Sequence, residues 1–297
     1  MASHIINSRL RIAVRIASRY RSFSSTSQAI QVKSVDAPHC GSIKILSLNR
    51  PAARNAISRQ LLTELRHHVE ETHAEPENGP TRALILASAV DNAFCAGADL
   101  KERATFTQED TSEFLTGLRS TFQRIEELPI PTITALHAPA FGGGLELALT
   151  TTLRVFSSSA TVALPETRLA ILPGAGGTYR LPAIIGLSRA RDLILTGRRV
   201  NAPEAYFLGL CDRLVQEDES GDMAKTRETT LKEAIGLATD ICEGGPVAIR
   251  QALRAVNGCF MREEAENAAY DVVVKTQDRD EALVAFREKR KPVFKGK

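Results

Sequence analysis

The sequence predicts an α/β protein with parallel strands joined by helical crossovers, followed by a helical C-terminal region. Up to about residue 200, short apolar segments typical of strands alternate with longer segments that carry apolar residues on one helical face. This order favours parallel pairing with crossovers. The composition then changes, and the remaining stretch has a mostly helical pattern. With 297 residues, 43% of them hydrophobic, the chain can bury a sizeable core.

The N-terminus has the composition of a mitochondrial transit peptide. Residues 1–35 contain no Asp or Glu, and residues 22–27 are rich in Ser. Five arginines stand between aliphatic residues in this stretch: Arg9, Arg11, Arg15, Arg19 and Arg21. An amphipathic, Arg-rich and acid-free segment is typical of such a peptide. We therefore expect residues 1–31 to be a targeting segment with a flexible N-terminus. A basic tail that binds anionic surfaces and a plastid address are the alternatives.

The first half of the folded region is expected to alternate strands and helices. Residues 42–48 mostly alternate in polarity and predict a strand, and residues 83–87 predict a short buried strand. Ser58 is a good N-cap for the helix between them. Thr107 opens a capping box for the next helix. The two helical faces consist of Leu61, Leu62, Leu65 and Val69, then Phe114, Leu115, Leu118, Phe122, Ile125 and Leu128.

The second half continues this pattern into the C-terminal region. Pro129 and Pro131 end the preceding helix, and strands are expected at 132–136 and 154–156. A Gly-rich turn at 141–144 leads into a short apolar helix. Helices are expected at 145–151, from the loop 172–177 to about 197, and at 231–241, 247–256, 263–275 and 279–289.

Composition excludes several classes of protein. The formal charge of +3 gives no argument for nucleic acid. Removing residues 1–23 takes away five arginines and no acid, which changes this charge to −2. No apolar run approaches the roughly 20 residues that span a bilayer. The five cysteines are scattered, odd in number and without a CxxC pair, so neither a disulfide framework nor a zinc site is expected.

The Gly-rich turn is the first candidate for chemistry. Glycines between a strand and a helix let the backbone approach a ligand closely, and the amides there can polarise a carbonyl oxygen. A tight turn that needs glycine only for packing is the alternative. A dinucleotide site fails on spacing, because Leu147 stands where the third glycine of that motif belongs.

Two carboxylates form the second candidate. Glu146 lies in the first turn after the glycines among apolar residues, and Glu166 follows Leu164 and Pro165. Two carboxylates in one apolar pocket can take different protonation states and share acid and base work. In the alternative, Glu146 caps its own helix and Glu166 pairs with Arg168 or Arg180.

The third candidate is the segment 94–100, where small residues follow a strand. The Ala98 amide could form the second half of an oxyanion hole. Cys95 could be a nucleophile, but without a histidine partner a small buried core residue is the better interpretation. His67 and His68 are expected on a solvated helix face.

Taken together, these segments resemble the crotonase superfamily, the enoyl-CoA hydratase/isomerase fold, from about Val32 to Lys297. Four motifs stand in the family's order, and the ordered set is specific although each motif is weak alone. They are an opening motif at 49–56, a first oxyanion loop at 94–101, a Gly-Gly-Gly-x-Glu turn at 141–147 and a second acid motif at 165–178. The resemblance implies a crotonase-like spiral of ββα units with a helical C-terminal trimerisation region. It divides the chain into residues 1–31, a core domain of residues 32–200 and a helical C-terminal region of residues 201–297.

The resemblance also implies roles for individual residues. The amides of Ala98 and Gly143 would hold a thioester oxygen, while Glu146 as base and Glu166 as acid would add water across a conjugated double bond. No metal or redox cofactor is expected, because the substrate is carried as a coenzyme A thioester. The residues expected to bind coenzyme A or substrate are Arg54, Ala96, Asp99, Leu100, Lys101, Gly174 and Lys289, with Arg54, Lys101 and Lys289 as candidates for its phosphates.

Within the superfamily the motifs are most similar to the methylglutaconyl-CoA hydratase branch. This implies a hydratase for a short or branched enoyl-CoA, 3-methylglutaconyl-CoA of leucine degradation in particular, in the mitochondrial matrix. It also implies a homotrimer or homohexamer, with Arg168 as a candidate partner for a distal carboxylate. The alternatives are a general enoyl-CoA hydratase of fatty-acid β-oxidation and a non-catalytic RNA-binding protein of the same fold. The helix at 58–71 contains no lysine, which argues against RNA binding.

Overall fold

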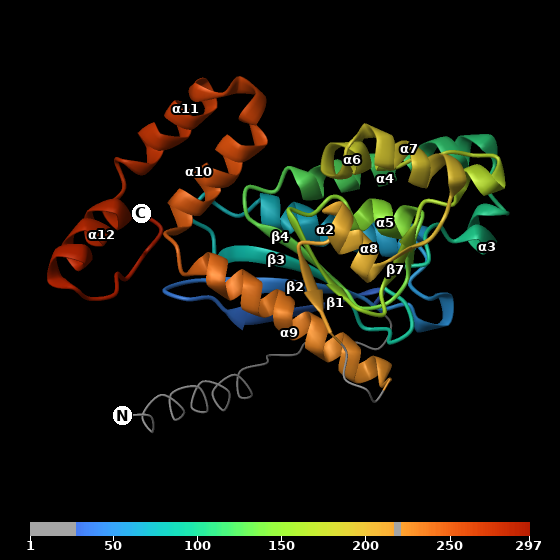
Figure 1. Cartoon of the computed structure of the whole chain (residues 1–297), viewed down its shortest axis with the longest axis horizontal. Coiled ribbons are helices and arrows are strands. Elements are labelled where there is room, and N and C mark those ends of the chain that lie inside the picture. The colour runs from blue at the N-terminus through green and yellow to red at the C-terminus, as the bar shows by residue number, and fades with distance from the viewer. Residues whose placement is uncertain (1–27, 217–220) are drawn as a thin grey trace.

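The computed structural model describes residues 28–216 and 221–297 (Figure 1). Its main sheet has six strands. The strand order is β1-β2-β3-β4-β6-β9. β1 pairs antiparallel with β2, and every later pair in this sheet is parallel. The predicted parallel arrangement is therefore confirmed. The strands are β1 (Ile30–Asp36), β2 (Ser42–Leu48), β3 (Thr81–Ser88), β4 (Thr132–Leu136), β6 (Leu153–Ser157) and β9 (Arg213–Val215).

A second, three-stranded sheet has the order β5-β7-β8. Its strands are β5 (Ala140–Phe141), β7 (Thr161–Ala163) and β8 (Val200–Asn201). Strands of two or three residues have no measurable periodicity, so the sequence pattern did not predict them. β1 was missed for another reason, because it begins at Ile30, inside the segment assigned to targeting. The rest of the predicted transit peptide, residues 1–27, lies outside the described residues.

Helices cover both faces of the main sheet. On one face lie α2 (Arg59–His73) and α4 (Gln108–Glu126), whose predicted caps are both present. The Ser58 side chain accepts from the Leu61 amide, and Thr107 with Asp110 forms the capping box. The other face packs against α9 (Met223–Cys242) through Ala234, Leu237 and Ala238. Because both faces are covered, the central strands are apolar on both sides.

Short helices lie between successive strands of the chain. They are α3 (Leu100–Arg103), α5 (Gly143–Ala148), α6 (Gly177–Ile185), α7 (Leu187–Thr196) and α8 (Ala202–Leu208). Two 3-10 turns, η1 (Pro51–Ala53) and η2 (Glu166–Leu169), lie among these elements, and η3 (Cys259–Met261) lies in the last part of the chain. α5, η2 and the start of α6 carry the residues that the sequence singled out for chemistry.

The last part of the chain projects from this body (Figure 1). It consists of α10 (Pro246–Asn257), α11 (Glu263–Val273) and α12 (Gln277–Glu288), close to the predicted helices. The region after residue 200 is less purely helical than expected, since β8 spans residue 200 and β9 joins the main sheet. The expected helix at 231–241 is the second half of α9, which packs on the main sheet and does not project.

Candidate active site

Two loops meet in backbone contact at the carboxyl side of the sheets. Cys95 and Ala140 form a parallel β-bridge between them, and the Phe141 amide donates to the Cys95 carbonyl at 3.1 Å. A methyl group on Gly144 would lie 2.3 Å from the Cys95 oxygen. Glycine is therefore required there for the loops to come this close. The contact brings together the first oxyanion loop, residues 94–101, and the Gly-Gly-Gly-x-Glu turn, residues 141–147.

Two backbone amides face the space between these loops. Neither the Ala98 nor the Gly143 amide is hydrogen-bonded within residues 28–216 and 221–297. A methyl group placed on Gly143 would lie 3.9 Å from the Ala98 nitrogen and 4.0 Å from Glu146 Oε2. Two free donors and one carboxylate oxygen thus surround one small volume. This is the arrangement that stabilises a developing oxyanion.

Glu146 is buried and held by a neighbouring loop. Its Oε1 accepts hydrogen bonds from the amides of Ala175 at 2.8 Å and Gly177 at 2.9 Å. Burial raises the pKa of this carboxyl, while the two amides, Arg180 and Arg119 act against that rise. The hydrogen bonds fix the carboxylate and leave Oε2 toward the cavity.

Glu166 is the second buried acid of the site. It begins η2 directly after Pro165, and its Oε2 has no hydrogen-bond partner in the described part of the chain. A methyl group on Gly142 would lie 2.7 Å from its Oε1, and Gly142 has a φ of 52°. Burial raises the pKa of Glu166 to about 7, and Glu146 adds to the rise. Glu166 can therefore be protonated near neutral pH.

The alternative partners of these acids are occupied elsewhere. Arg180 pairs with Glu126 at 2.7 Å. Arg168 is exposed, donates to the Thr196 carbonyl at 2.8 Å and does not line the cavity. Arg168 is therefore not placed to meet a substrate carboxylate, and the structure does not support the ion pairs considered for Glu166.

A cavity of about 750 Å³ joins these groups. Of the predicted site residues it is lined by Ala96, Ala98, Leu100, Gly143, Glu146, Glu166 and Gly174. Its other walls are mainly apolar and come from α4 and the segment after η2, including Phe114, Leu115, Leu118, Leu169, Ile171 and Leu172. A concave, mostly apolar space with a few converging polar groups is the usual form of a small-molecule site.

Four predicted site residues lie outside this lining. Arg54 is exposed, and its carbonyl accepts from the Ala96 amide at 3.0 Å, which places it beside the cavity. Lys101 is exposed on α3. Asp99 has a local role instead, because it caps α3 and pairs with Arg50 at 3.0 Å. Lys289 ends α12 on the projecting part of the chain (Figure 1).

Cys95 is a core residue, as its surroundings in the sequence indicated. Its thiol is buried and donates to the Asn55 carbonyl, and burial raises its pKa to about 12. The buried His137 is kept neutral by desolvation, which lowers its pKa to about 4. Neither group is suited to nucleophilic or general-base work at neutral pH.

Several residues of the site were missed at the level of sequence. The amides of Ala175 and Gly177 hold Glu146, whereas the loop was singled out only for Gly174. The α4 stripe was interpreted as core, yet Phe114, Leu115 and Leu118 also line the cavity. The spacing of that stripe is the signal that could have found them, but it is the same for a buried face and for a cavity wall.

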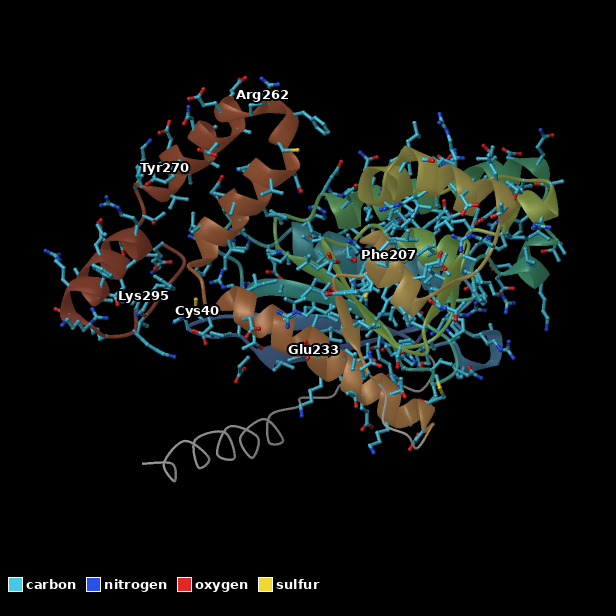
Figure 2. The ribbon with its side chains drawn as sticks, in the orientation of Figure 1. Cys40, Phe207, Glu233, Arg262, Tyr270 and Lys295 are labelled. Carbon is cyan, nitrogen blue, oxygen red and sulfur yellow. The ribbon has the colours of Figure 1, made fainter. Side chains whose placement is uncertain are left out.

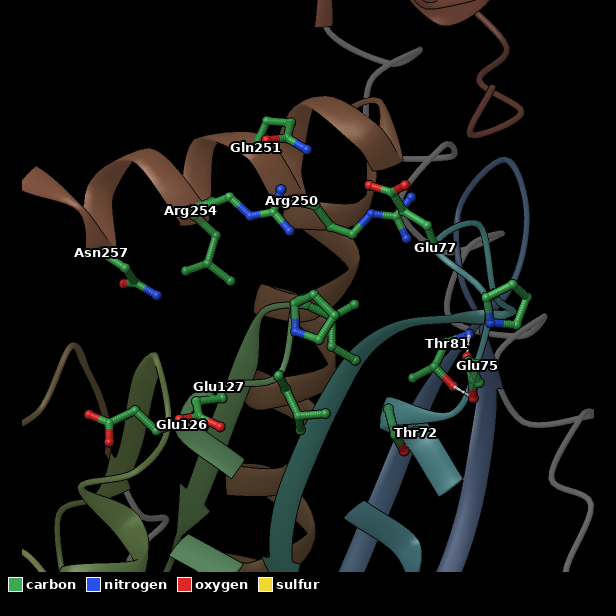
Figure 3. A pocket seen from close by; sticks show the side chains of 16 residues that line it. Thr72, Glu75, Glu77, Thr81, Glu126, Glu127, Arg250, Gln251, Arg254 and Asn257 are labelled. Carbon is green, nitrogen blue, oxygen red and sulfur yellow. Dashed lines mark hydrogen bonds between the residues drawn. The ribbon is translucent and has the colours of Figure 1, made fainter. Parts of the chain in front are cut away.

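A second cavity, of about 540 Å³, lies between α10 and the loops that precede β3 and β4 (Figure 3). Three of its four acids have partners: Glu126 pairs with Arg180, Glu127 lies 3.8 Å from Arg124, and Glu75 accepts from Thr81. No oxyanion-type pair of amides and no second buried carboxylate faces it among the described lining residues. We therefore do not assign the chemistry to this cavity.

One group of side chains in the described ranges is close enough to share a metal ion. His67, His68 and Glu71 lie on the outer side of α2, with His68 Nδ1 2.9 Å from Glu71. The Lys44 ammonium lies 3.6 Å from the same carboxylate and competes for it. None of the three ligands lines the cavity of Glu146 and Glu166.

The model of the enoyl-CoA hydratase/isomerase family matches residues 39–297. This chain belongs to that family. It is 54% identical to methylglutaconyl-CoA hydratase 1, mitochondrial, of Pyricularia oryzae, over 90% of this chain and 87% of that protein. It is 61% identical to an enoyl-CoA isomerase/hydratase of Zymoseptoria tritici, over 95% of this chain and 92% of that protein.

A solved structure confirms the fold assignment. The enoyl-CoA hydratase from Bacillus anthracis superposes with a TM-score of 0.82 at 40% identity, covering 91% of this chain and all of that one. The crotonase fold expected from the ordered motifs is therefore confirmed. Human methylglutaconyl-CoA hydratase, mitochondrial, is 38% identical over 93% of this chain and 80% of that protein.

Proposed function

We propose that this protein adds water across the α,β double bond of an enoyl-CoA thioester. The observation that carries the proposal is that two buried carboxylates and two backbone amides meet in one cavity. Among the described residues, Glu146 and Glu166 have no ion-pair partner, and the amides of Ala98 and Gly143 are not hydrogen-bonded. Family membership supports the same chemistry. Isomerisation of the double bond only moves a proton, whereas hydration also needs groups that hold and activate a water molecule. Two acids in one cavity can do this.

The reaction divides between the two kinds of group. The amides of Ala98 and Gly143 donate to the thioester oxygen and stabilise the enolate that forms when water attacks C3. Glu146, ionised, takes the proton of that water as its oxygen bonds to C3. Glu166, protonated, delivers a proton to C2 as the enolate collapses back to the thioester. Proton exchange with solvent then resets both acids.

Coenzyme A is proposed to lie across the outer mouth of the cavity. Ala96 and Leu100 line that mouth, and the exposed Arg54 and Lys101 lie close by for its phosphates. Lys289 is on the projecting helices, so we propose that it reaches a phosphate bound to a neighbouring copy (Figure 1). The α-proton chemistry needs only the thioester, and we propose no metal or redox cofactor.

We propose 3-methylglutaconyl-CoA as the preferred substrate. The names of the Pyricularia and human relatives support this choice. The experiment is a comparison of kcat/KM for 3-methylglutaconyl-CoA and crotonyl-CoA, followed through the loss of the conjugated double bond. We expect the first substrate to be preferred at least tenfold. Equal values would favour the general β-oxidation hydratase, and no hydration of either would reject the proposed function.

The mitochondrial matrix is the proposed location. Relatives named mitochondrial include the Pyricularia, human and Arabidopsis thaliana proteins, and the first 31 residues have the composition described above. No helix in the described residues is long and apolar enough to cross a bilayer. A fluorescent fusion of residues 1–35 is expected to enter the matrix, and replacing its five arginines with glutamine is expected to keep it in the cytosol.

We also propose that the projecting helices assemble the protein into a homotrimer or a homohexamer. They expose apolar side chains that a lone chain leaves in water, with Phe260 at 96% and Phe286 at 84% exposure. Tyr270 on α11 also points away from the body (Figure 2). In this proposal the part used for assembly begins at α10, later than the division at residue 200, because β9 and α9 belong to the main body.

A further inference from the structure

The cavity is lined by two arginines to which the proposed mechanism gives no contact with the substrate. Arg103 ends α3 and lies over the ring of Phe114 at 6.0 Å, and Arg119 extends from α4. The only acids in the described lining are Glu146 and Glu166. Within residues 28–216 and 221–297 neither arginine forms an ion pair with a carboxylate. Arg103 is half-buried and Arg119 is exposed at the edge of the cavity, and a cation without a carboxylate partner at that position is available to an anionic group of the ligand.

Arg119 is connected to the reacting centre through a single peptide group. Its Nε donates to the Gly174 carbonyl at 2.7 Å, and the amide of the same peptide, that of Ala175, donates to Glu146 Oε1 at 2.8 Å. A peptide unit is planar and its oxygen and nitrogen are about 2.3 Å apart. Arg119 Nε and the Glu146 carboxylate are therefore at most about 8 Å apart.

The hydrogen bond to Gly174 fixes the guanidinium and leaves its outer edge free. Only Nε donates to the Gly174 carbonyl, so the N–H groups of both terminal nitrogens remain available. This edge of a guanidinium can bind a carboxylate through two parallel hydrogen bonds. Arg103 lacks this anchor and lies on the side of α3, next to the segment proposed for coenzyme A. Arg119 is thus on the Glu146 side of the cavity and Arg103 on the side of the cofactor portion.

The geometry points to a carboxylate at the far end of the acyl chain. We propose that Arg119 is a specificity-determining residue that binds a substrate carboxylate whose carbon is two bonds beyond C3. Such a group extends about 4 Å past C3, and a hydrogen bond adds about 2.8 Å. Together these lengths come to about 7 Å, which is comparable with the upper limit of about 8 Å between Arg119 Nε and the Glu146 carboxylate. The substrate class is an enoyl-CoA that carries a second, distal carboxylate. This inference rests on the proposed hydration at the same site.

The test compares glutaconyl-CoA with crotonyl-CoA, which differ by one carboxylate. Arg119→Gln removes the charge but keeps a donor for the Gly174 carbonyl. We expect it to lower kcat/KM for glutaconyl-CoA about 10- to 100-fold more than kcat/KM for crotonyl-CoA, mainly through KM. Arg119→Lys keeps the charge and is expected to retain most of the preference.

The controls separate this role from two others. If Arg119 only positions the loop that holds Glu146, Arg119→Gln will lower kcat for both substrates equally, and the proposal is wrong. Arg103→Gln is the matched control and is expected to affect both substrates alike; a selective loss there and none at Arg119 would also overturn the proposal. Failure of the wild type to hydrate crotonyl-CoA and glutaconyl-CoA would instead reject the proposed function itself.

Discussion

Glu166 is a buried acid whose side chain is not fully satisfied by its surroundings. It is buried, its Oε2 lacks a partner in the described chain, and its pKa is raised to about 7. A buried carboxyl without compensating donors costs stability when it ionises. Carboxyls with a raised pKa are common at functional sites, and in the proposed reaction Glu166 is protonated before it delivers its proton.

The raised pKa of Glu166 predicts how activity depends on pH. The acid loses its proton as the pH rises through about 7, so kcat/KM should fall above that value, by about tenfold per pH unit at the limit. The pH profile of kcat/KM for crotonyl-CoA from pH 5 to 9 measures this directly. A profile that is flat between pH 7 and 9 would mean that an ionised Glu166 works equally well.

The same pKa predicts a pH-dependent effect on stability. Between pH 4.5 and about 7 the folded protein holds a proton on Glu166 that the unfolded chain releases. The free energy of unfolding therefore decreases as the pH rises through this range. Glu166→Gln cannot ionise, and we expect its melting temperature to exceed that of the wild type by about 2–4 °C at pH 8 but not at pH 4.5. Equal differences at both pH values would contradict the linkage.

At the scale of elements, the meeting of the two Gly-containing loops controls the site. A side chain at Gly144 would press against the Cys95 carbonyl and separate Ala98 from Gly143. We expect Gly144→Ala to cost about 1–3 kcal/mol of stability and to lower kcat about 10²-fold or more. Chemical denaturation and hydration of crotonyl-CoA measure the two effects.

Gly236 in α9 gives a matched control for this substitution. Nothing lies within 4 Å of a methyl group added there, and the position is inside a helix. Gly236→Ala is expected to stabilise the protein by about 0.5–1 kcal/mol and to leave kcat unchanged. Similar behaviour of the two variants would show that the contact at Gly144 has no special role.

How far the elements could be predicted from the sequence depended on their length. Caps and apolar stripes predicted α2 and α4, and the longer parallel strands were recognised from their apolar patterns. β5, β7 and β8 are too short for a pattern, and the role of Arg119 depends on a loop 55 residues further along. Glu146 and Glu166 could be singled out because acids in apolar surroundings are unusual, whereas the wall of α4 looked like any core face.

At the scale of the whole molecule, the projecting helices predict an assembly. Phe260 and Phe286 are almost fully exposed in the single chain, and the basic Lys289 is far from the chain's own cavity. We expect light scattering on the chain from residue 28 to give a trimer or hexamer at micromolar concentration. Phe260→Asp with Phe286→Asp should shift it toward the monomer and raise the KM for crotonyl-CoA. A monomeric wild type with the same KM would contradict this proposal.

The measurement that tests the central account most directly is the hydration rate of Glu146→Gln and Glu166→Gln with saturating crotonyl-CoA, next to wild type. Both substitutions preserve size, and circular dichroism checks that each variant is folded. Because each acid moves a proton in the proposed reaction, we predict that kcat falls about 10²- to 10⁴-fold in each variant. Wild-type kcat in either folded variant would contradict the assignment of the two carboxylates as the acid and base of this enzyme.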